Sequence, residues 1–331
     1  MNIIVTGGGG FIGNLLIKKL SGDDSVKSII GIDTIPQPED IKQISKVAWI
    51  QADLATKGWE EKLPPQLPID VVIHCAFKIR NPYGEKNIVK KENFASGHAV
   101  FGFSIRRNAS KIIYLSTVSA YGAKPENIGK LLSENEPLSE KENPYGCQKI
   151  EAENDLTALI KKTNSKTQAF ILRLNSITGP VGQSMGSKFG LITFLKKLLP
   201  FIIEANPYWA RQFVHEEDLV EIIYLLTVKN ILQTGRNPEV FNIAPPNFLT
   251  ARDMSKLLNK RILKIPAWSV KPLFSIAWHG SLGRIPTRPD SAMGLIYPIN
   301  VDGSRIENVL GFHYSHTAQE AFLAQNNKLI Q

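Results

Sequence analysis

Short apolar runs alternate with longer amphipathic stretches through the first half of the chain. Buried strands of a parallel sheet form short apolar runs, and the helices that connect such strands carry apolar positions at helical spacing. Phe11–Leu20 and Ile150–Lys162 have this helical spacing. The runs that fit strands are Ile3–Thr6, Ser28–Asp33, Ala48–Ala52, Val71–Ala76, Lys111–Ser116 and Ala169–Leu174. The pattern predicts an α/β fold in which helices cover a parallel sheet.

The pattern changes after about residue 175. Gly179-Pro180, Asn206-Pro207 and Pro245-Pro246 divide the second half into shorter pieces with less regular alternation. We expect a first domain over residues 1–175 and a smaller C-terminal α/β lobe over residues 176–331. Some segments of the lobe are expected to return to the first domain.

A glycine-rich segment, TGGGGFIG, follows the first predicted strand directly and leads into the first predicted helix. Where a tight turn brings the backbone close to a pyrophosphate, and a helix close to a strand, a β-carbon does not fit. The segment matches GxGxxG through Gly8, Gly10 and Gly13, and it matches TGxxGxxG through Gly7, Gly10 and Gly13. We prefer the second register. The segment predicts a Rossmann-type doubly wound sheet with phosphates at the helix N-terminus.

An acidic residue stands where the adenosine ribose of a dinucleotide would bind. Asp33 ends the second predicted strand, twenty residues after Gly13. A carboxylate at this point accepts hydrogen bonds from the ribose hydroxyls, and it would repel the 2′-phosphate of NADP. The sequence therefore favours NAD over NADP as the cofactor.

Tyr145 and Lys149 lie four residues apart next to a predicted helix, so we expect both on one helix face. A phenol has an ordinary pKa of about 10, and a nearby ammonium together with a positive nicotinamide ring would favour the phenolate. Tyr145 would then exchange a proton with a substrate hydroxyl or carbonyl while hydride passes to or from nicotinamide. Thr117 follows the fifth predicted strand and would bind the same substrate oxygen.

Composition narrows the classes of partner. The chain has 331 residues, of which 43% are hydrophobic and 21% charged, as in ordinary globular enzymes. Its formal net charge is +9, but the basic residues are scattered, which favours an anionic small-molecule substrate over nucleic acid. Cys75 and Cys147 form no CxxC pair, and no histidines have metal-ligand spacing, so we expect no metal and a cytoplasmic protein. No apolar run is long enough to predict a membrane-spanning helix.

With these motifs in this order, the chain resembles the extended short-chain dehydrogenases/reductases, in particular the NAD-dependent epimerase/dehydratase family. TGGGGFIG resembles the family's cofactor loop and GIDT its ribose-binding strand end. QADLAT is similar to the family's adenine contact, and VVIHCAF to a segment that lines the cofactor. The resemblance implies cofactor contacts from Gly7, Gly10, Phe11, Ile12, Gly13, Asp33, Asp53, Leu54, Ala76, Tyr145 and Lys149.

The resemblance also implies roles around the substrate. KENFASG places Asn93 at the family's active-site asparagine, which completes a catalytic set with Thr117, Tyr145 and Lys149. LRLNSITGP and RQFVHEEDLVEII resemble segments of the substrate lobe. In them the resemblance implies substrate contacts from Thr117, Ser119, Ser176 and Arg211, and the arginine matches one that often meets a nucleotide-sugar phosphate.

Several positions depart from the family pattern. Phe77 stands where a small residue is usual, and Ser176 where asparagine is common. After Tyr121-Gly122 there is no acidic pair of the kind that dehydratases use around the active threonine, so dehydration is the least favoured reaction. The stretch from Gly182 to Ala210 is short and apolar, and it contains Phe189, Leu191, Ile192, Phe194, Leu195, Leu198, Leu199, Phe201, Ile202 and Ile203. We expect these residues to pack the lobe, with a lipophilic substrate as the alternative.

The leading hypothesis is an NAD-dependent enzyme that acts on a secondary alcohol or ketone, either as a nucleotide-sugar 4-epimerase or as a dehydrogenase/reductase. Arg211 favours the epimerase, and the short apolar stretch favours a reductase or dehydrogenase of a sterol-like substrate. A hypothesis of another class is a non-catalytic, NAD-binding regulatory protein. The intact Thr117, Tyr145 and Lys149 argue against it.

Two further expectations concern surfaces. Trp268–Leu282 is rich in aromatic and aliphatic residues, with Lys271 among them. We expect this segment to pack in the core or to cover the substrate, and peripheral membrane contact is the alternative. The family resemblance implies a homodimer through helices near Phe94–Arg107 and Ile150–Lys162.

Overall fold

The computed structural model describes residues 1–79, 83–84, 86–185, 196, 199–231, 235–285 and 287–324. The chain forms two compact units, each built from three separate segments. Unit 1 comprises Met1–Ser116, Gln148–Arg173 and Val220–Phe241. Unit 2 comprises Thr117–Cys147, Leu174–Leu219 and Asn242–Gln331. The assignment of cofactor binding to residues 1–175 and of substrate binding mainly to residues 176–331 stays a prediction.

Unit 1 is built around a seven-stranded sheet whose strands follow the order β11-β6-β5-β4-β1-β2-β3. The pairs from β3 to β5 are parallel. After β1 the chain adds β2 and β3 on one side and then returns to place β4 on the other side. The strands are β1 Asn2–Thr6, β2 Ser28–Asp33, β3 Val47–Gln51, β4 Val71–His74, β5 Lys111–Thr117, β6 Gln168–Leu174 and β11 Glu239–Ile243.

The doubly wound α/β fold expected from the sequence is confirmed. Six of the seven strands coincide with predicted apolar runs to within one or two residues, and β2 has the predicted bounds. Ile29, Ile30, Ile32, Val72 and Ile73 are almost completely buried, as expected for strands covered on both faces. The strand order reverses between β1 and β4, and sheets of this kind bind ligands at such a point.

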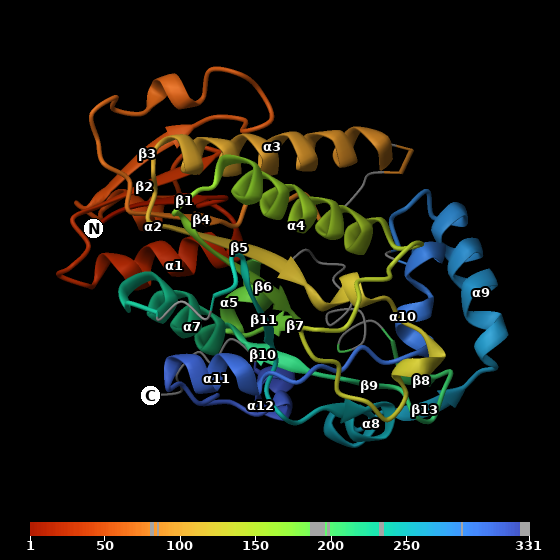
Figure 1. The fold of residues 1–331 in the computed structure, drawn as a ribbon. Coiled ribbons are helices and arrows are strands. Elements are labelled where there is room, and N and C mark those ends of the chain that lie inside the picture. Colours follow the sequence, from red (N-terminus) through yellow and green to blue (C-terminus); the bar gives the residue numbers. More distant parts are fainter. Residues whose placement is uncertain are drawn as a thin grey trace. The chain divides into compact units, whose positions relative to one another are not determined.

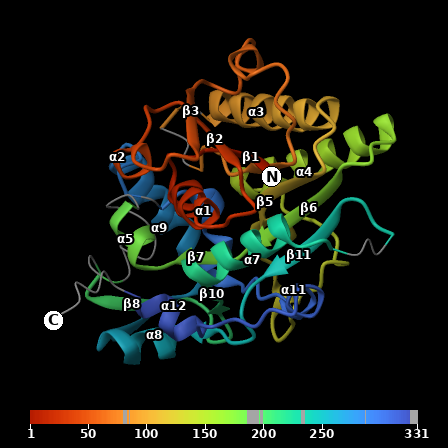
Figure 2. The same ribbon diagram turned by 90° about the vertical axis from the view of Figure 1, so that its left-hand side faces the viewer.

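Helices cover both faces of this sheet. Figures 1 and 2 show α3 and α4 along one face, with α1 and α7 on the opposite face. On the second face, Lys19 of α1 pairs with Glu221 of α7 at 2.8 Å, and the Tyr224 hydroxyl donates to Asp23 at 2.7 Å. These helices are α1 Phe11–Ser21, α3 Lys86–Arg106, α4 Pro144–Thr163 and α7 Glu216–Val228.

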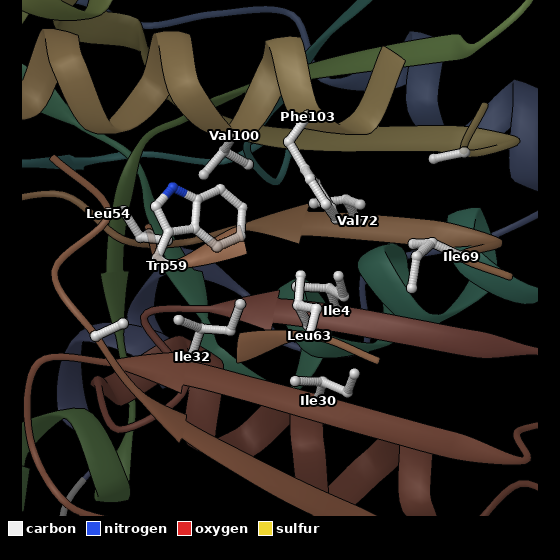
Figure 3. Close-up of a cluster of buried hydrophobic side chains, with 12 residues drawn as sticks. Ile4, Ile30, Ile32, Leu54, Trp59, Leu63, Ile69, Val72, Val100 and Phe103 are labelled. Carbon is white, nitrogen blue, oxygen red and sulfur yellow. The ribbon is translucent and has the colours of Figure 1, made fainter. Parts of the chain in front are cut away.

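A cluster of buried apolar side chains joins α3 to the sheet (Figure 3). Trp59, from the connection after β3, packs against Phe103 of α3 with ring centroids 5.0 Å apart. Ile4, Ile32 and Val72 meet these rings from the strands. Because tightly packed side chains leave little freedom of movement, this cluster fixes the edge of the sheet that carries the glycine turn.

Unit 2 contains short strands paired two by two, and helices. β10 pairs parallel with β7, β13 parallel with β8, and β12 antiparallel with β9. The strands are β7 Ser176–Thr178, β8 Phe201–Glu204, β9 Ala210–Arg211, β10 Phe213–His215, β12 Leu249–Thr250 and β13 Arg261–Lys264. The helices are α5 Pro180–Met185, α8 Ala251–Leu258, α9 Ala267–Gly280, α10 Met293–Ile296, α11 Ser304–Leu310 and α12 Ala318–Leu323. Shorter elements of the described residues are α2 Glu39–Lys42 and the 3-10 turns η1 Glu60–Lys62, η2 Val118–Tyr121, η3 Pro125–Asn127 and η5 Pro289–Ser291.

Unit 2 has its own buried clusters. Phe213 of β10 packs on Phe322 of α12 with ring centroids 5.0 Å apart, and Trp209 and Met254 belong to the same cluster. The capping boxes at Thr250 and Thr317 satisfy N–H groups at the starts of α8 and α12. Across the described part of the chain, no helix combines the length and the apolar character needed to cross a membrane.

Candidate functional site

The turn after β1 depends on glycine at two positions. Gly7 has φ +69°, and a β-carbon there would lie 2.7 Å from the backbone nitrogen of Ala76. A β-carbon on Gly13 would lie 2.2 Å from the carbonyl oxygen of Gly7. The turn thus lies against the segment that follows β4, and α1 packs onto the turn without intervening side-chain atoms. This is the close approach that a bound pyrophosphate requires.

The N-terminus of α1 is open to an anion. Its N-cap, Gly10, offers no side-chain hydrogen bond, and the first turn of α1 contains no acidic residue. The first N–H groups of a helix lack partners within the helix and carry partial positive charge. The residues of this turn therefore suit a phosphate group.

Asp33 lies beside the same turn, at the end of β2. Its Oδ2 accepts a hydrogen bond from the Gly9 N–H at 3.0 Å, and its Oδ1 accepts one from the Ile35 N–H at 3.3 Å. The carboxylate is held at the mouth of the glycine turn, where it is only partly buried. This position suits an acceptor for ribose hydroxyls.

One pocket of unit 1 collects residues from the ends of four strands. Phe11, Ile12 and Gly13 occupy the first turn of α1 and do not line this pocket. The predicted residues that line it are Gly7, Gly10, Asp33, Asp53, Leu54, Ala76 and Asn93. These residues come from positions far apart in the sequence, so their convergence is a property of the fold.

Asn93, in α3, is buried and fully engaged in hydrogen bonds. Its Oδ1 accepts from the Lys78 N–H at 2.8 Å, and its Nδ2 donates to the Lys78 carbonyl at 3.0 Å and to Gln148 Oε1 at 2.8 Å. The side chain therefore fixes the backbone that follows β4 and ties it to α4. In this arrangement Asn93 holds the pocket wall in place.

Thr117 and Tyr145 form a hydrogen-bonded pair in unit 2. Burial raises the pKa of Tyr145 to about 12, and the hydrogen bond from the Thr117 side chain opposes that rise. Thr117 Oγ1 also accepts from the Ser119 N–H at 3.2 Å, which caps η2. Asn143 Oδ1 accepts from the Tyr145 N–H at 3.1 Å near the start of α4. The pair thus places a phenol beside a hydroxyl donor that stabilises its anion.

Lys149 is buried in unit 1, and its Nζ donates to the Leu115 carbonyl at 2.5 Å. The ammonium also lies 3.8 Å from the ring centroid of Phe77 and 4.6 Å from that of Tyr114. Burial lowers the pKa of Lys149 to about 7, and the negative charge of Glu153, like that of Cys75 when it is a thiolate, opposes that fall. Cation–π contact favours the charged form as well.

Two further titratable groups, His74 and Cys75, interact with Lys149. His74, whose Nδ1 shares a hydrogen bond with Thr6 Oγ1 at 2.7 Å, has its pKa lowered to about 3, mainly by burial and then by Lys149. Burial raises the pKa of the Cys75 thiol to about 12. Near neutral pH both groups are therefore uncharged, and Lys149 is the group there whose charge can change.

Helix α4 carries both Tyr145 and Lys149, one helical turn apart. The sequence predicted a helix from Ile150, and the structure begins it at Pro144. Proline in the first turn explains the earlier start, because its missing N–H is not needed there. The tyrosine and the lysine thus belong to the regular part of the helix, as their spacing predicted.

The comparisons with known proteins agree with this arrangement. The model of the NAD dependent epimerase/dehydratase family matches residues 3–244. The chain belongs to the NAD-dependent epimerase/dehydratase family. This confirms the family resemblance predicted from the sequence, and it makes the chain a member of a family of enzymes.

The relatives catalyse several different reactions. The chain is 26% identical to dTDP-D-glucose 4,6-dehydratase of Homo sapiens over 73% of this chain and 68% of that protein. It is 24% identical to dTDP-4-dehydro-6-deoxyglucose reductase of Escherichia coli over 79% and 82% of the two chains. A dehydratase and a reductase are thus similarly distant, so identity does not select the reaction.

Solved structures of other proteins share this fold. MoeE5 in complex with UDP-glucuronic acid and NAD matches with a TM-score of 0.72 and 19% identity, over 98% of each chain. UDP-glucose 4-epimerase of Thermotoga maritima, solved with UDP-glucose, matches with a TM-score of 0.72 and 19% identity, over 97% of this chain and 96% of that one. At this identity the likeness supports the shared fold alone.

The predicted substrate residues of this family member lie in unit 2. Ser119 belongs to η2 and Ser176 to β7, where the Ser176 N–H donates to Asn175 Oδ1 at 2.8 Å. Arg211 lies in β9 with its guanidinium carbon 6.0 Å from the centroid of a Trp209 ring, and burial lowers its pKa. Their contact with a substrate stays a prediction.

Some features of the family member were beyond sequence reasoning. Phe77 covers the Lys149 ammonium, although the sequence showed only that it is larger than usual at its position. His215 stacks on His316 with ring centroids 3.8 Å apart, and Glu217 lies nearby. No spacing rule connects positions so far apart. Of the apolar stretch after Gly182, Phe189, Leu191, Ile192, Phe194, Leu195 and Leu198 lie outside the described residues.

Proposed function

We propose that this protein is an NAD-dependent enzyme that oxidises or reduces a secondary alcohol or ketone on the sugar of a nucleotide sugar. The observation that carries the proposal is the Thr117–Tyr145 hydrogen bond, with Lys149 one turn further along α4. A buried phenol with a hydroxyl donor beside it is the group expected to exchange a proton with an alcohol. Family membership supplies the reaction class.

NAD is the proposed cofactor, and the residues of unit 1 fit it. The glycine turn admits a pyrophosphate, α1 offers its N-terminal N–H groups, and Asp33 offers a carboxylate for the ribose. Asp53 and Leu54 line the same pocket and would contact the adenine, while Ala76 leaves room for the cofactor. The carboxylate of Asp33 disfavours the 2′-phosphate of NADP.

The chemistry follows from the residues of the chain. When held in the pocket lined by Gly7, Asp33 and Ala76, NAD would supply the hydride acceptor for the carbinol carbon of the sugar. Tyr145, as phenolate, takes the proton of the same hydroxyl, so that one hydride and one proton leave together. With substrate bound, the single hydrogen of the Thr117 hydroxyl is donated to the substrate oxygen in place of Tyr145, and the positive charge of Lys149 favours the phenolate. In the reverse step Tyr145 returns the proton to the carbonyl oxygen.

We favour a 4-epimerase or a dehydrogenase/reductase over a dehydratase. Dehydration of the sugar needs an additional acid and base to remove a proton and expel a hydroxyl. After Thr117, η2 presents Val118, Ser119 and Ala120, and Tyr121 is buried with its hydroxyl donating to Asn242. These side chains offer no carboxylate beside the threonine.

The nucleotide moiety is proposed from Arg211 and from the relatives. A guanidinium suits a diphosphate, because its fork of N–H groups binds two oxygens at once.

A reductase or dehydrogenase of a lipophilic, sterol-like substrate remains the alternative, and a non-catalytic NAD-binding regulator is the alternative of another class. We also propose a homodimer through α3 and α4 and a location in the cytoplasm.

The decisive experiment starts from the purified protein. Acid denaturation of one sample releases any bound nicotinamide cofactor for quantification. NAD and NADP are then titrated into native protein from which the cofactor has been removed. UDP-glucose, UDP-glucuronic acid and dTDP-glucose follow as substrates, each deuterated at C4. Tightly held NAD and retention of deuterium in a C4-inverted product would support an epimerase. Loosely bound NAD and deuterium transfer to added NAD would support a dehydrogenase. Absence of binding to either cofactor would contradict the proposed function.

A further inference from the structure

Helix α9 presents an apolar surface to solvent. Trp268 is 78% exposed and Ile276 71% exposed, and Leu273 between them is 49% exposed. Trp268 and Ile276 are eight residues apart and therefore lie on the same side of the helix. On the other side Val270 is completely buried, and Phe274 packs in the same cluster. The helix therefore has large apolar side chains on both sides but is packed on only one.

A helix that is apolar all round normally lies inside a protein or against another apolar medium. Most soluble proteins avoid large exposed apolar patches unless they bind something. In α9 the exposed face contains a tryptophan, an isoleucine and a leucine with no acidic residue among them. Leu263 before the helix is 42% exposed and Leu282 after it 66% exposed, which extends the apolar character beyond both ends.

All the charged residues in the sequence segment that contains α9 are basic. No aspartate or glutamate occurs between Asp253 and Asp290. The same segment contains the basic residues Lys256, Lys260, Arg261, Lys264, Lys271, Arg284 and Arg288. The segment therefore carries net positive charge in the sequence on both sides of the exposed apolar side chains of α9.

Part of this charge is neutralised within the protein. Lys271 pairs with Glu142 at 2.8 Å, and Lys264 lies 4.0 Å from Glu204. Arg261 and Arg284 are exposed, and no carboxylate in the described part of the chain lies within ion-pair distance of either. These two arginines flank α9 on either side in the sequence and are available to an external anion.

We propose that α9 and its flanking segments, residues 261–284, bind the surface of an anionic lipid membrane. The exposed apolar side chains would enter the headgroup boundary, and the flanking arginines would meet lipid phosphates. The helix has 14 residues. Because a spanning helix needs about 20 residues, α9 lies on the surface and does not cross it. The positive charge of this segment favours an anionic lipid over a neutral one.

This inference goes beyond the proposed function and is independent of it. Membrane binding would place a nucleotide-sugar enzyme beside reactions that consume its product at a lipid surface. From the sequence, packing in the core or over the substrate is expected and peripheral membrane contact is the alternative, because a Trp-rich segment usually packs in a core. The exposure of Trp268 and Ile276 is the observation that reverses the preference.

The test is flotation of the full chain with vesicles. One set contains phosphatidylcholine alone, and the other an equimolar mixture of phosphatidylcholine and phosphatidylglycerol. We expect the protein to float with the mixed vesicles and not with neutral ones, and to detach at high salt. The double variant Trp268→Ser/Ile276→Ser should lower partitioning by about tenfold or more, because both side chains lose apolar burial. Arg261→Gln/Arg284→Gln should abolish the preference for anionic vesicles.

The matched control is Leu131→Ser, which removes a 51% exposed apolar side chain elsewhere in unit 2. It should float like the wild type. Circular dichroism and NAD affinity, measured on every variant, show that the fold is intact, so a failure of membrane binding is distinguishable from a failure of the proposed function. Wild-type protein that stays at the bottom of the gradient would overturn the inference. So would a Trp268→Ser/Ile276→Ser variant that floats normally but changes from dimer to monomer in light scattering, since the face would then be a subunit contact.

Discussion

Arg173 and Glu153 form a buried ion pair in unit 1, with Arg173 Nη2 2.8 Å from Glu153 Oε2 and side chains only 7% and 5% exposed. Arg173 Nε also approaches both carboxylate oxygens at 3.3 Å, and the Ser116 hydroxyl donates to Oε1. Glu153 lies one turn after Lys149 in α4, and its charge raises the pKa of that lysine. The pair therefore links β6 to α4, and the Ser116 hydroxyl joins β5 to it.

Removal of one partner of this pair should destabilise the protein strongly. Arg173→Met leaves Glu153 buried without its countercharge, which typically costs about 3–5 kcal/mol of free energy of unfolding. Arg173→Met combined with Glu153→Leu should recover much of that loss, because no unpaired charge stays buried. Urea denaturation of the three proteins measures the effect.

The control for this pair is the exposed ion pair of Arg106 with Glu60, 2.7 Å apart. Arg106→Met should cost less than about 1 kcal/mol, since surface ion pairs contribute little. Equal losses for Arg173→Met and Arg106→Met would show that burial of the first pair has no energetic consequence.

Tyr145→Phe should remove turnover and leave the cofactor bound. The phenol is the proposed proton donor and acceptor, so its loss should lower kcat by about 10²–10⁴-fold while NAD affinity is unchanged. Thr117→Val keeps the shape of the side chain but removes the hydrogen bond that lowers the pKa of Tyr145. Its kcat should fall less, and the pH at which the rate rises should move upward. Turnover by Tyr145→Phe at the wild-type rate would assign the proton transfer to another group.

Lys149 should make stability depend on pH. Its pKa is lowered to about 7 in the folded protein, against 10.5 in the unfolded chain. Between these values the unfolded chain binds more protons, so the free energy of unfolding should rise as pH increases from about 7 toward 10. Lys149→Met has no titrating group at this position, so its free energy of unfolding should depend less on pH. The variant should also be more stable than the wild type near pH 7.

Lys111 serves as the internal reference in that experiment. Burial lowers its pKa to about 8, and Lys111 is present in both proteins, so the difference in slope between wild type and Lys149→Met belongs to Lys149. Parallel pH profiles in urea denaturation would mean that Lys149 is less buried than its position in α4 indicates.

The sequence predicted the parallel sheet well, because buried strands such as Ser28–Asp33 are continuous apolar runs between turn residues. The glycine turn could be predicted equally well, because the space at positions 7 and 13 admits only glycine. Both signals are local. They lie within a few residues of one another and need no knowledge of tertiary contacts.

The features that the sequence did not predict depend on contacts between residues far apart in the chain. The stacking of His215 on His316 joins positions with no spacing rule between them, and Phe77 reaches Lys149 only because β4 and α4 meet in the fold. For Tyr145 the sequence suggested that a neighbouring ammonium lowers the pKa, whereas burial dominates in the structure and raises it. The extent of burial at one side chain is a tertiary property that a motif does not report.

Gly13 should be the least replaceable residue of α1, and Gly22 at the other end of the helix is its matched control. A β-carbon on Gly13 would meet the Gly7 carbonyl oxygen at 2.2 Å, so Gly13→Ala must move either the turn or the helix. The nearest atom to a β-carbon on Gly22 is the Lys19 carbonyl oxygen at 3.5 Å, and the backbone there is in the right-handed helical region. Gly22→Ala should therefore be neutral, or stabilising by about 0.4–1 kcal/mol.

Gly13→Ala should instead lose NAD binding, because displacement of the turn removes the space for the pyrophosphate. Isothermal titration with NAD measures the affinity of both variants, and thermal unfolding reports their stability. If Gly13→Ala bound NAD as tightly as Gly22→Ala does, the pyrophosphate would not lie between the glycine turn and the N-terminus of α1, and the proposed cofactor position would be wrong.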